Sequence, residues 1–537
     1  MQRDLLRLAN EPFDLLIIGG GVTGACVARD AARRGMKVAL VEKGDFASAT
    51  SAHNSKLIHG GLRYLRNFEL GLVRESLRER RIWQRIAPHL VQPLPFLVPL
   101  YKAGFQARAT LSAGLTLYDV LSYDRGWLDD PDERLPGHEF LARDRAIAEE
   151  PMLDAPGFEG TFRYYDAQMY APERLALENI LDATLHGAAA ANYVAAERLL
   201  IRNGRIEGAV VREQFGGGEI AIQAKLTLLA AGPWADLFLN QALGKPTAHK
   251  LLRSKGIHLL VPPMTRKDAL TVAAGGGHFF VLPWRGYSLL GTTDTAFHGA
   301  PDDVGVNEKD IDDFLGFING HLPSAHLKRG DVKHFYAGLR PLVDDGTGDT
   351  YDASRRAELI DHGKDDGVAG LFSAIGGKWT TSRDLAETVT DTLAVQLGRR
   401  LGASTTATAP MPGGNIQRRR QFFADQARAY PGLATEHLAR LYGTRLRFVI
   451  EAAHNRLEPI GTTGDIAAQV LFAVREEMAM TLSDVVLRRT GIGQLGDPGT
   501  AALEATATLM ADELGWDAAR KAREIDTTSR SFRLSGS

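Results

Sequence analysis

The sequence has a single cysteine, almost no net charge and no long hydrophobic run. Cys26 is alone among 537 residues, so the chain has no internal disulfide framework and suits a reducing compartment. A formal net charge of −2 gives no global reason to expect nucleic-acid binding. No uninterrupted apolar run approaches the roughly eighteen residues that a membrane-spanning helix needs. These absences predict a protein of the cytoplasm or of the cytosolic face of a membrane.

The remaining composition describes an ordinary globular chain. Hydrophobic residues make up 44% of the sequence and charged residues 24%, and the length allows two to four domains. The histidines and acidic residues show no ligand spacing such as H-x-x-x-H beside a third ligand, so we expect no metal site.

Residues 14–42, DLLIIGGGVTGACVARDAARRGMKVALVE, have the order strand, glycine turn, helix and strand. This order predicts a βαβ unit in which G-x-G-x-x-G binds a dinucleotide. Gly19 permits the tight turn, Gly21 lets a pyrophosphate approach the backbone, and Gly24 lets the helix pack on the sheet. Glu42 closes the second strand, where an acidic side chain accepts hydrogen bonds from a ribose. The alternative is a purely structural turn.

Three further segments favour FAD over NAD. LFSAIGGKWTTSRDLAE, residues 371–387, repeats the pattern of strand, glycine pair and helix start. Its helix N–H groups suit the end of a flavin that becomes negative on reduction. AKLTLLAAGPWAD, residues 224–236, is an apolar strand able to pass close to the nucleotide. SAHNSKLIHGGLRYL, residues 51–65, places many donors around a glycine pair, and each piece alone is also compatible with a simple turn.

Together these segments resemble the FAD-dependent (respiratory) glycerol-3-phosphate dehydrogenases of the D-amino-acid-oxidase-like flavoprotein group. The matching stretches, in the family's order over roughly residues 12–390, are IIGGGVTGACVARDAARRG, SKLIHGGLRYL, AAGPWAD, KGIH, LPWRGYSLLGTTD, YAGLRPL and GGKWTTSRDLAE. The resemblance implies an α/β fold with an FAD-binding Rossmann-type domain, an antiparallel-sheet substrate domain and a C-terminal helical cap. It also implies FAD-linked oxidation of sn-glycerol 3-phosphate to dihydroxyacetone phosphate, with electrons passed to a membrane quinone.

The domain organisation follows from the same resemblance. We expect a discontinuous FAD-binding domain made of residues 1–95, 150–235 and 335–400. Residues 96–149 and 236–334 would form the substrate-binding roof over the flavin. The stretch ATAPMPGG, residues 407–414, is typical of a linker, and the helical patterns beyond it predict a C-terminal cap over 410–537.

The resemblance also implies which residues surround the flavin. The backbone and the Ser, Asn and Lys side chains of SKLIHGGLRYL and the residues before it would line the ring, and the glycines would give clearance. We expect FAD without a covalent link, because no cysteine lies in the flavin-facing motifs and His59 is the one plausible attachment point. The expected cofactor-binding residues are Gly19, Gly21, Gly24, Glu42, Thr50, Ser51, Ser55, Lys56, His59, Gly60, Gly61, Ala231, Gly232, Gly376, Gly377 and Thr380.

A substrate with a dianionic phosphate needs several fixed cations in its pocket. Binding of the remote phosphate would also orient the reacting C–H bond. By their motifs we expect Arg340 and Lys378 to be catalytic. Arg355 and Arg356 are interchangeable in this role because the motif match around them is loose. The alternative role for Arg355 is a surface ion pair. The expected substrate-binding residues are Arg63, Tyr64, Thr292, Thr293 and Arg355.

Two histidines, His59 and His258, lie inside the matching motifs. A histidine titrates near neutrality and suits proton acceptance from an alcohol, so His258 is the candidate base. His59 is expected in the flavin wall. The alternative for His258 is a structural role, with Arg340 or Lys378 then stabilising a developing alkoxide electrostatically.

Residues 100–126 are the candidate membrane contact through which a quinone would be reached. They place Leu, Phe and Tyr on one helical face with basic residues near its borders, as in an interfacial helix, and a buried amphipathic helix is the alternative. We expect a cytoplasmic protein, peripheral on the cytosolic face of the inner membrane. Its partners would be glycerol 3-phosphate, quinone and the membrane surface, without nucleic acid, and a homodimer is compatible with the sequence.

Two other functions fit the same motifs. An oxidase of this fold would pass the electrons to oxygen, and sequence separates it poorly because the difference lies in access around the flavin. A non-catalytic flavin-binding scaffold or sensor is the alternative from another class. The clustered cations of GLRPL and GGKWTT argue against the scaffold.

Overall fold

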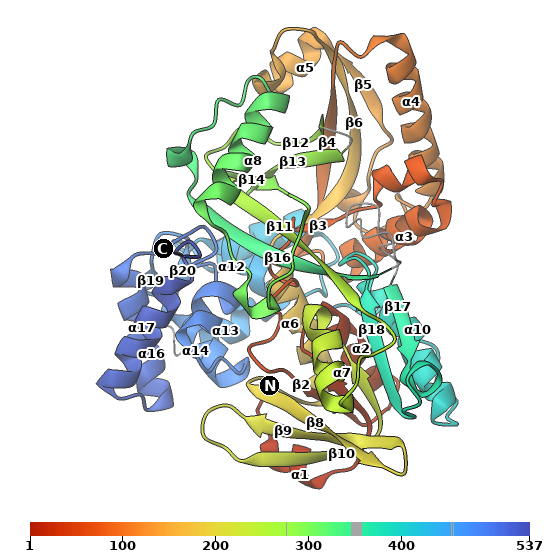
Figure 1. The fold of residues 1–537 in the computed structure, drawn as a ribbon. Coiled ribbons are helices and arrows are strands. Elements are labelled where there is room, and N and C mark those ends of the chain that lie inside the picture. Colours follow the sequence, from red (N-terminus) through yellow and green to blue (C-terminus); the bar gives the residue numbers. More distant parts are fainter. Residues whose placement is uncertain (275–276, 345–356, 453, 455, 537) are drawn as a thin grey trace.

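The computed structural model describes the chain from residue 1 to 536, apart from residues 275–276, 345–356, 453 and 455. Two large sheets dominate the fold, and a group of C-terminal helices lies beside them (Figure 1). In Figure 1 the antiparallel sheet occupies the upper half and the mainly parallel sheet the lower half. The α/β fold class expected from the sequence is confirmed.

The mainly parallel sheet is built around the predicted βαβ unit. β1 (Phe13–Ile18) pairs in parallel with β2 (Val38–Val41) and with β10 (Glu219–Leu229). α2 (Val22–Arg33) connects β1 to β2. The order across the sheet is β17-β18-β10-β1-β2-β7, and β9 (Arg205–Glu213) pairs with both β10 and β8 (Val194–Arg202) beside this path. The remaining strands are β7 (Ala189–Ala191), β17 (Ala357–Asp361) and β18 (Leu371–Gly376).

β1 shows why this part of the sequence is a continuous apolar run. All six of its side chains are buried. Leu15 and Ile17 belong to one hydrophobic cluster, and Leu16 and Ile18 belong to another, because alternate strand residues face opposite sides of a sheet. Both faces of the sheet are therefore covered, as is usual for parallel strands.

The second sheet is mostly antiparallel, as predicted for the roof. Its order is β15-β11-β14-β13-β12-β4-β6-β3, with β16 beside β11 and β5 beside β6. α8 (Glu308–His321) packs on it through the apolar side chains of Phe314 and Ile318. Its strands are β3 (Leu57–Ile58), β4 (Val91–Tyr101), β5 (Glu139–Ala142), β6 (Phe158–Met169), β11 (Leu251–Val261), β12 (Ala269–Ala274), β13 (Gly277–Trp284), β14 (Tyr287–Gly291), β15 (Thr295–Ala296) and β16 (His334–Val343).

The domain boundaries expected at residues 150 and 335 do not coincide with the division of the strands between the two sheets. β6 pairs with β4, and β16 pairs with β11, so both strands lie in the antiparallel sheet. By sequence both fall within segments assigned to the FAD-binding domain. An apolar strand pattern indicates a strand but does not name its pairing partner. The FAD-binding segments therefore contribute strands to both sheets, and the division into domains stays a prediction.

Beyond residue 414 the described part of the chain is mainly helical, as the sequence predicts, apart from the short paired strands β19 (Pro459–Ile460) and β20 (Asp465–Ile466). The helices pack against one another and, in Figure 1, lie mainly to the left of the two sheets. The bounds are α11 (Arg419–Ala429), α12 (Thr435–Tyr442), α13 (Leu446–Ala452), α14 (Ala467–Glu476), α15 (Leu482–Asp484), η8 (Val485–Arg489), α16 (Thr500–Leu514) and α17 (Ala518–Arg530).

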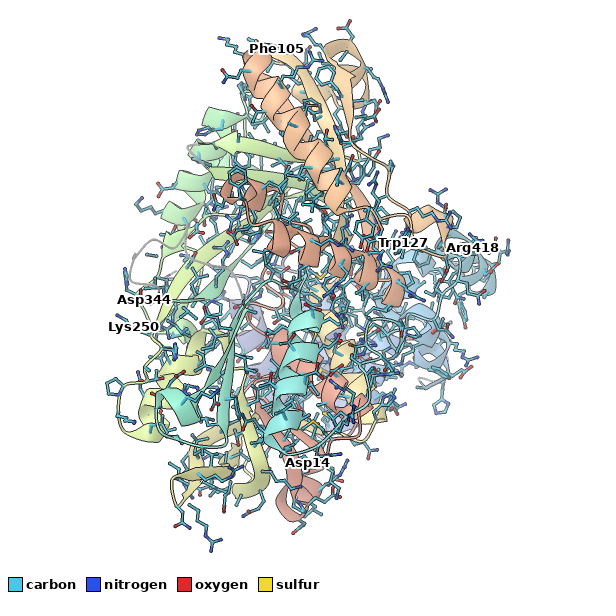
Figure 2. All side chains as sticks on the ribbon, turned by 90° about the vertical axis from the view of Figure 1, so that its right-hand side faces the viewer. Asp14, Phe105, Trp127, Lys250, Asp344 and Arg418 are labelled. Carbon is cyan, nitrogen blue, oxygen red and sulfur yellow. The ribbon has the colours of Figure 1, made fainter. Side chains whose placement is uncertain are left out.

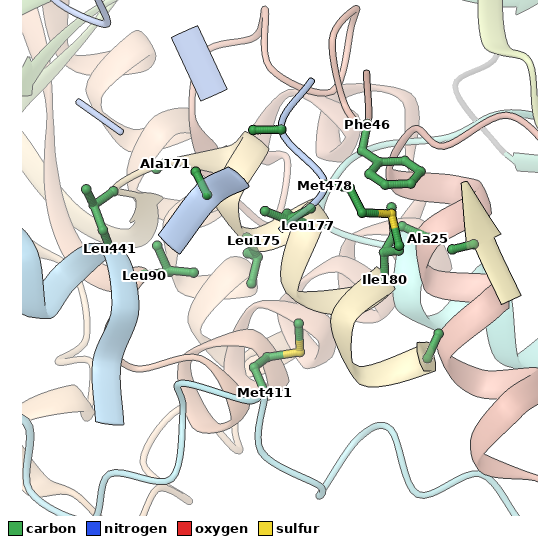
Figure 3. Close-up of a cluster of buried hydrophobic side chains, with 14 of the residues drawn as sticks. Ala25, Phe46, Leu90, Ala171, Leu175, Leu177, Ile180, Met411, Leu441 and Met478 are labelled. Atoms are coloured by element: carbon green, nitrogen blue, oxygen red, sulfur yellow. The ribbon is translucent and has the colours of Figure 1, made fainter. Parts of the chain in front are cut away.

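These C-terminal helices share a hydrophobic core with the βαβ unit (Figure 3). Ala25 of α2, Ile180 of α6 (Pro172–Leu185) and Met478 belong to one buried cluster. Met411 belongs to the same cluster and is 1% exposed. The stretch 407–414, predicted as a linker, is thus a packed connection, and the C-terminal region is fixed against the cofactor half of the molecule.

Candidate active site

The glycine turn after β1 has the geometry that a dinucleotide motif needs. Gly19 has φ +116°, and a Cβ there would lie 2.4 Å from the carbonyl oxygen of Ala230. A Cβ at Gly24 would lie 2.0 Å from the carbonyl oxygen of Gly19, so the helix packs as closely as predicted. Gly21 is the N-cap of α2 and lines a pocket. The N-terminus of α2 therefore faces this pocket, as an anion site requires, although the N–H of Val22 already donates to the Ser51 hydroxyl at 2.8 Å.

That pocket has a volume of about 640 Å³ and lies where β1, β2, β10 and β18 end. Ligands of open α/β sheets bind at this edge. We refer to it as the cofactor pocket. Twelve of the predicted cofactor residues line it, namely Gly19, Gly21, Glu42, Thr50, Ser51, Ser55, His59, Ala231, Gly232, Gly376, Gly377 and Thr380.

Glu42 shows how the second strand contributes to this pocket. Its carboxylate accepts hydrogen bonds from the backbone N–H of Gly20 at 2.7 Å and of Gly44 at 2.8 Å. Burial raises the pKa of Glu42, and these two hydrogen bonds act against that rise. The carboxylate is thus fixed in the wall at the position that the sequence assigns to ribose binding.

Four predicted cofactor residues do not line the cofactor pocket. Gly24 supports the turn from behind, and Gly61 lines the neighbouring cavity. Gly60 packs on Tyr118, whose hydroxyl oxygen would lie 2.3 Å from a Cβ at that position. Lys56 has φ +56°, and its Nζ lies 4.6 Å from the centre of the Trp284 ring. The left-handed turn thus places the Lys56 side chain against an aromatic ring. Among the described residues, neither Lys56 nor Gly60 lines the cofactor pocket or the cavity beside it.

The neighbouring space, which we call the substrate cavity, has a volume of about 1030 Å³. Thr50, Asn54, Ser55, His59, Arg340 and Lys378 line both it and the cofactor pocket, so the two spaces adjoin. The predicted substrate and catalytic residues in its wall are Arg63, Tyr64, His258, Thr292, Thr293, Arg340 and Lys378. Arg355 lies outside the described residues.

Arg340, on β16, is held by side chains of neighbouring strands and loops. Its Nη1 donates to the Ser254 hydroxyl at 2.9 Å, and its Nη2 donates to the Thr292 hydroxyl at 2.8 Å. Asp294 lies 3.8 Å from Nη1. The Thr293 hydroxyl accepts from the backbone N–H of Ile257 at 3.0 Å. The two threonines therefore orient the arginine and the strand that carries His258.

Sequence reasoning did not select Ser254 or Asp294, although both stand in or beside matched motifs. Ser254 begins the SKGIH stretch, and Asp294 ends GTTD. The Ser254 hydroxyl donates to Asp294 at 2.6 Å while it accepts from Arg340. The available signal was their place beside His258 and Thr293 in the matched motifs, because a half-buried guanidinium needs acceptors.

A second group of cations lies around Tyr64. Lys378 Nζ lies 4.2 Å from the centre of the Tyr64 ring and donates to the Ser76 hydroxyl at 2.7 Å. The Arg63 guanidinium lies 4.9 Å from the centre of the same ring. Two positive side chains thus converge on one aromatic ring in the cavity wall, where an anion would be attracted to both.

His258 is 2% exposed and lies in the cavity wall. Its Nε2 lies 2.8 Å from the Ser55 hydroxyl, and its ring stacks on Tyr336 with centroids 5.0 Å apart. Its Nδ1 has no hydrogen-bond partner among the described atoms. Burial, and then the positive charge of Arg340, lowers the pKa of His258 well below 6.5. The imidazole is therefore neutral at pH 7, and the same burial and charge make it a weaker proton acceptor than a histidine in water.

FAD fits these walls on three structural grounds. The glycine turn leaves no room for side chains between β1, α2 and β10, so backbone alone faces the pocket at that point. The half-buried carboxylate of Glu42 stands one strand away at the same edge. A pocket that joins a second cavity lined by Arg340 and Lys378 suits a cofactor whose reacting end meets an anionic substrate.

Comparisons with known proteins agree with this arrangement. Residues 14–391 match the FAD dependent oxidoreductase family, and residues 404–521 match the C-terminal domain of alpha-glycerophosphate oxidase. The chain is 36% identical to the glycerol-3-phosphate dehydrogenase of Synechocystis sp., covering 96% of this chain and 95% of that protein. It is 33% identical to the mitochondrial glycerol-3-phosphate dehydrogenase of Mus musculus, covering 98% of this chain and 74% of that protein.

A solved structure shares the whole fold. The crystal structure of glycerol-3-phosphate dehydrogenase from Bacillus halodurans, complexed with FAD, aligns with a TM-score of 0.78 at 27% identity. The alignment covers 98% of this chain and 96% of that chain. The cofactor of this fold is FAD. The chain belongs to the FAD dependent oxidoreductase family and, within it, to the FAD-dependent glycerol-3-phosphate dehydrogenases.

Proposed function

We propose that the protein oxidises sn-glycerol 3-phosphate to dihydroxyacetone phosphate and delivers the electrons to a membrane quinone. The observation that carries this proposal is that Arg340 and Lys378 line both the cofactor pocket and the substrate cavity. Bound FAD would supply the acceptor for the hydride that leaves C2 of the alcohol. The chain itself must hold the phosphate and take up the hydroxyl proton.

Arg340, Lys378 and Arg63 are the cations proposed to hold the substrate. Arg340 is already oriented by Ser254 and Thr292, so little reorganisation is needed when an anion arrives. A guanidinium also presents paired N–H donors that match phosphate oxygens. Holding the remote phosphate fixes the position of the reacting carbon, which is the contribution expected of these residues.

His258 is proposed to accept the hydroxyl proton. Its neutral state at pH 7 leaves a ring nitrogen able to act as a base, with Ser55 fixing the orientation of the ring. The charge of Arg340 is one cause of its lowered pKa. A dianionic phosphate beside Arg340 would offset that charge, so the proton affinity of His258 should rise when substrate binds.

The substrate cavity extends beyond the cations and is the proposed approach for the quinone ring. One side of α4 (Gly104–Leu121) borders it through Gln106, Thr110 and Leu111. A small polyol phosphate fills only part of a space of about 1030 Å³. The remaining space adjoins apolar side chains such as Leu62 and Phe280, which suit a lipid-soluble acceptor.

The outer side of α4 is the proposed membrane contact. Phe105 is 87% exposed and Val120 62% exposed, and the chain continues into Trp127, which is 64% exposed. Figure 2 labels Phe105 at the upper end of this side of the molecule and Trp127 near its middle. Exposed aromatic and aliphatic side chains of this kind suit a membrane surface. Among helices in the described part of the chain, none is long and apolar enough to cross a membrane.

Leu115 does not belong to this contact. It is 0% exposed, while Leu117 on the same helix is 37% exposed. The helical pattern of residues 100–126 does not distinguish the two, because the side covered by the protein depends on tertiary packing. Peripheral attachment at the cytosolic face of the inner membrane and a homodimer both stay predictions.

The reaction is tested with purified holoenzyme and a soluble dye as electron acceptor. We expect one dihydroxyacetone phosphate for each dye molecule reduced by two electrons, with sn-glycerol 3-phosphate preferred over hydroxy acids and amino acids. With quinone-containing vesicles, turnover should exceed that supported by dissolved oxygen. Faster turnover with oxygen, accompanied by hydrogen peroxide, would identify an oxidase instead.

A further inference from the structure

The loop after β2 carries a buried carboxylate that the proposed reaction does not use. Asp45 is 2% exposed and lies three residues after Glu42. Its neighbours Lys43, Gly44 and Ala47 line the cofactor pocket, whereas Asp45 is not among the residues of its wall. Burying a charge is costly unless it is fully paired, so this carboxylate needs a structural explanation.

Its partners come from the far end of the chain. Arg489 donates from both terminal nitrogens to the two oxygens of Asp45, each at 2.7 Å. Arg488 donates to it from Nε at 2.5 Å, and Asn192 donates from its amide at 2.9 Å. We call these four residues the Asp45 anchor. Although burial alone would raise it, the two arginines hold the pKa of Asp45 below its usual range.

The arginines are themselves fixed within the C-terminal helices. Arg488 donates to the Asp484 carboxylate at 2.7 Å, and Arg489 donates to the backbone carbonyl of Glu477 at 3.1 Å. Both belong to η8, a π-helical turn that ends where the N–H of Thr490 donates to the carbonyl of Val485 at 3.1 Å. The C-terminal helices thus present two preset guanidinium groups to the loop after β2.

Asp45 connects directly to the glycine turn. Two residues later, the N–H of Ala47 donates to the carbonyl of Gly20 at 3.0 Å, and Ala47 holds a left-handed φ of +57°. The residue between them, Phe46, is 1% exposed and belongs to the same buried cluster as Met478 of the C-terminal region (Figure 3). A loop with such a conformation keeps its shape only when its surroundings fix it.

We propose that the C-terminal helical region positions FAD: Arg488 and Arg489 hold Asp45 and thereby keep loop 43–51 in the shape that walls the adenosine end of the cofactor. The four anchor residues are positioning residues, because they act through the loop and not by touching the cofactor. The proposal rests on the placement of FAD in the cofactor pocket. It gives the C-terminal region a role in cofactor retention besides any role in substrate access.

The test compares two identical substitutions at buried carboxylates. Asp45→Asn removes the charge that the two arginines hold. Asp268→Asn is the matched control, because Asp268 is 0% exposed and accepts from Arg163 at 2.6 Å but lines neither the cofactor pocket nor the substrate cavity. FAD is removed from each holoenzyme, and the Kd of the apo-protein for FAD and for ADP is measured by fluorescence titration. The thermal midpoint of each apo-protein is recorded alongside.

We expect Asp45→Asn to raise the Kd for FAD by about tenfold or more, and the Kd for ADP by a similar factor, because the loop walls the adenosine end. Asp268→Asn should stay within about twofold of the wild type. An Asp45→Asn protein that binds both ligands as the wild type does would overturn the proposal. An equal rise of both Kd values in Asp268→Asn would also overturn it, because the effect would then come from a general loss of stability.

Two further measurements keep the proposal testable if Asp45→Asn does not fold. Arg488→Gln leaves Arg489 on Asp45 and should raise the Kd for FAD by a smaller factor. In the unmodified protein, FAD should slow hydrogen exchange in residues 482–492 as well as in 43–51, since coupling between two sites is reciprocal. Unchanged exchange in 482–492 would overturn the proposal, whereas full FAD binding by Gly21→Val would instead overturn the placement of FAD on which it rests.

Discussion

Arg340 donates a hydrogen bond to the hydroxyl of Thr292 at 2.8 Å. The same hydroxyl donates to the carbonyl of Thr293 at 3.1 Å, so its own orientation is fixed by the backbone. The guanidinium is thereby set in place in the wall shared by the cofactor pocket and the substrate cavity. A preset cation at the junction of the two spaces is the feature on which the proposed chemistry most depends.

Arg340→Ala should lower kcat/KM for glycerol 3-phosphate by between about one and three powers of ten, with normal flavin content. Loss of a charge-assisted contact to a desolvated anion costs about 2–5 kcal/mol, and about 1.4 kcal/mol corresponds to a factor of ten in rate. The defect should shrink with glycerol, which has no phosphate. Thr292→Val keeps the charge but removes its orienting partner, so its defect should be smaller. Equal impairment on charged and neutral substrates would restrict Arg340 to the chemical step.

Gly21→Val should abolish FAD binding. Gly21 caps α2 and lines the pocket, so a branched side chain there would occupy the space of the pyrophosphate. Even a Cβ added at this position would lie only 3.2 Å from the Ser51 hydroxyl. The purified variant should be colourless, with unchanged secondary structure by circular dichroism. A yellow variant with full flavin content would show that the cofactor lies elsewhere.

FAD should be released completely by acid precipitation. The single cysteine, Cys26, is buried in α2 near Asn179 and Ser382 and does not line the pocket, which leaves His59 as the attachment point that the matched motifs offer. All yellow colour is expected in the supernatant. Colour that stays with the protein pellet would show a covalent bond, and peptide mapping would then locate it.

Aspartate at Leu117 and Val120 should reduce quinone-linked activity in vesicles and leave turnover with a soluble dye unchanged. Both side chains are exposed on α4, so charge there weakens contact with a membrane without disturbing the core. Leu115→Asp is the contrasting variant, since this fully buried side chain should be needed for folding and both activities should fall. Equal loss of both activities in the Leu117 and Val120 variant would remove α4 from the membrane contact.

His334→Gln should become more stable relative to the wild type as the pH falls. Burial lowers the pKa of His334 from 6.5 to about 4, so between these values the unfolded chain binds a proton that the folded chain does not. The wild type therefore loses stability as pH falls below 6.5, by up to about 2 kcal/mol between pH 7 and 5 for this residue. Urea unfolding of both proteins at several pH values measures the difference. A constant difference would show that His334 titrates normally.

Local motifs predict the cofactor turn well, because their conformation is set within a few residues. The positions of Gly19, Gly21 and Glu42 follow from a strand, a tight turn and a helix that are contiguous in sequence. The same motif-based reasoning predicts Lys56 and Gly60 in the flavin wall. The structure directs Lys56 toward Trp284 and packs Gly60 on Tyr118, contacts that depend on segments far away in the chain.

Sequence patterns could not predict which distant segments of the chain pair with one another. Asp45 and its arginine partners are 443 and 444 residues apart, and neither segment carries a signal that names the other. The assignment of β6 and β16 to the antiparallel sheet has the same origin, since their apolar patterns fit either sheet. On α4, the burial of Leu115 and the exposure of Leu117 depend on what packs beside the helix.

Anaerobic reduction of the bound flavin tests the central claim most directly. The yellow holoenzyme is mixed without oxygen with sn-glycerol 3-phosphate and, separately, with a panel of hydroxy acids and amino acids. We predict that glycerol 3-phosphate bleaches the flavin absorbance fully and within the time of a single turnover, and that a quinone analogue then restores the colour. A flavin that stays yellow with glycerol 3-phosphate, or that another substrate bleaches faster, would contradict the proposed function.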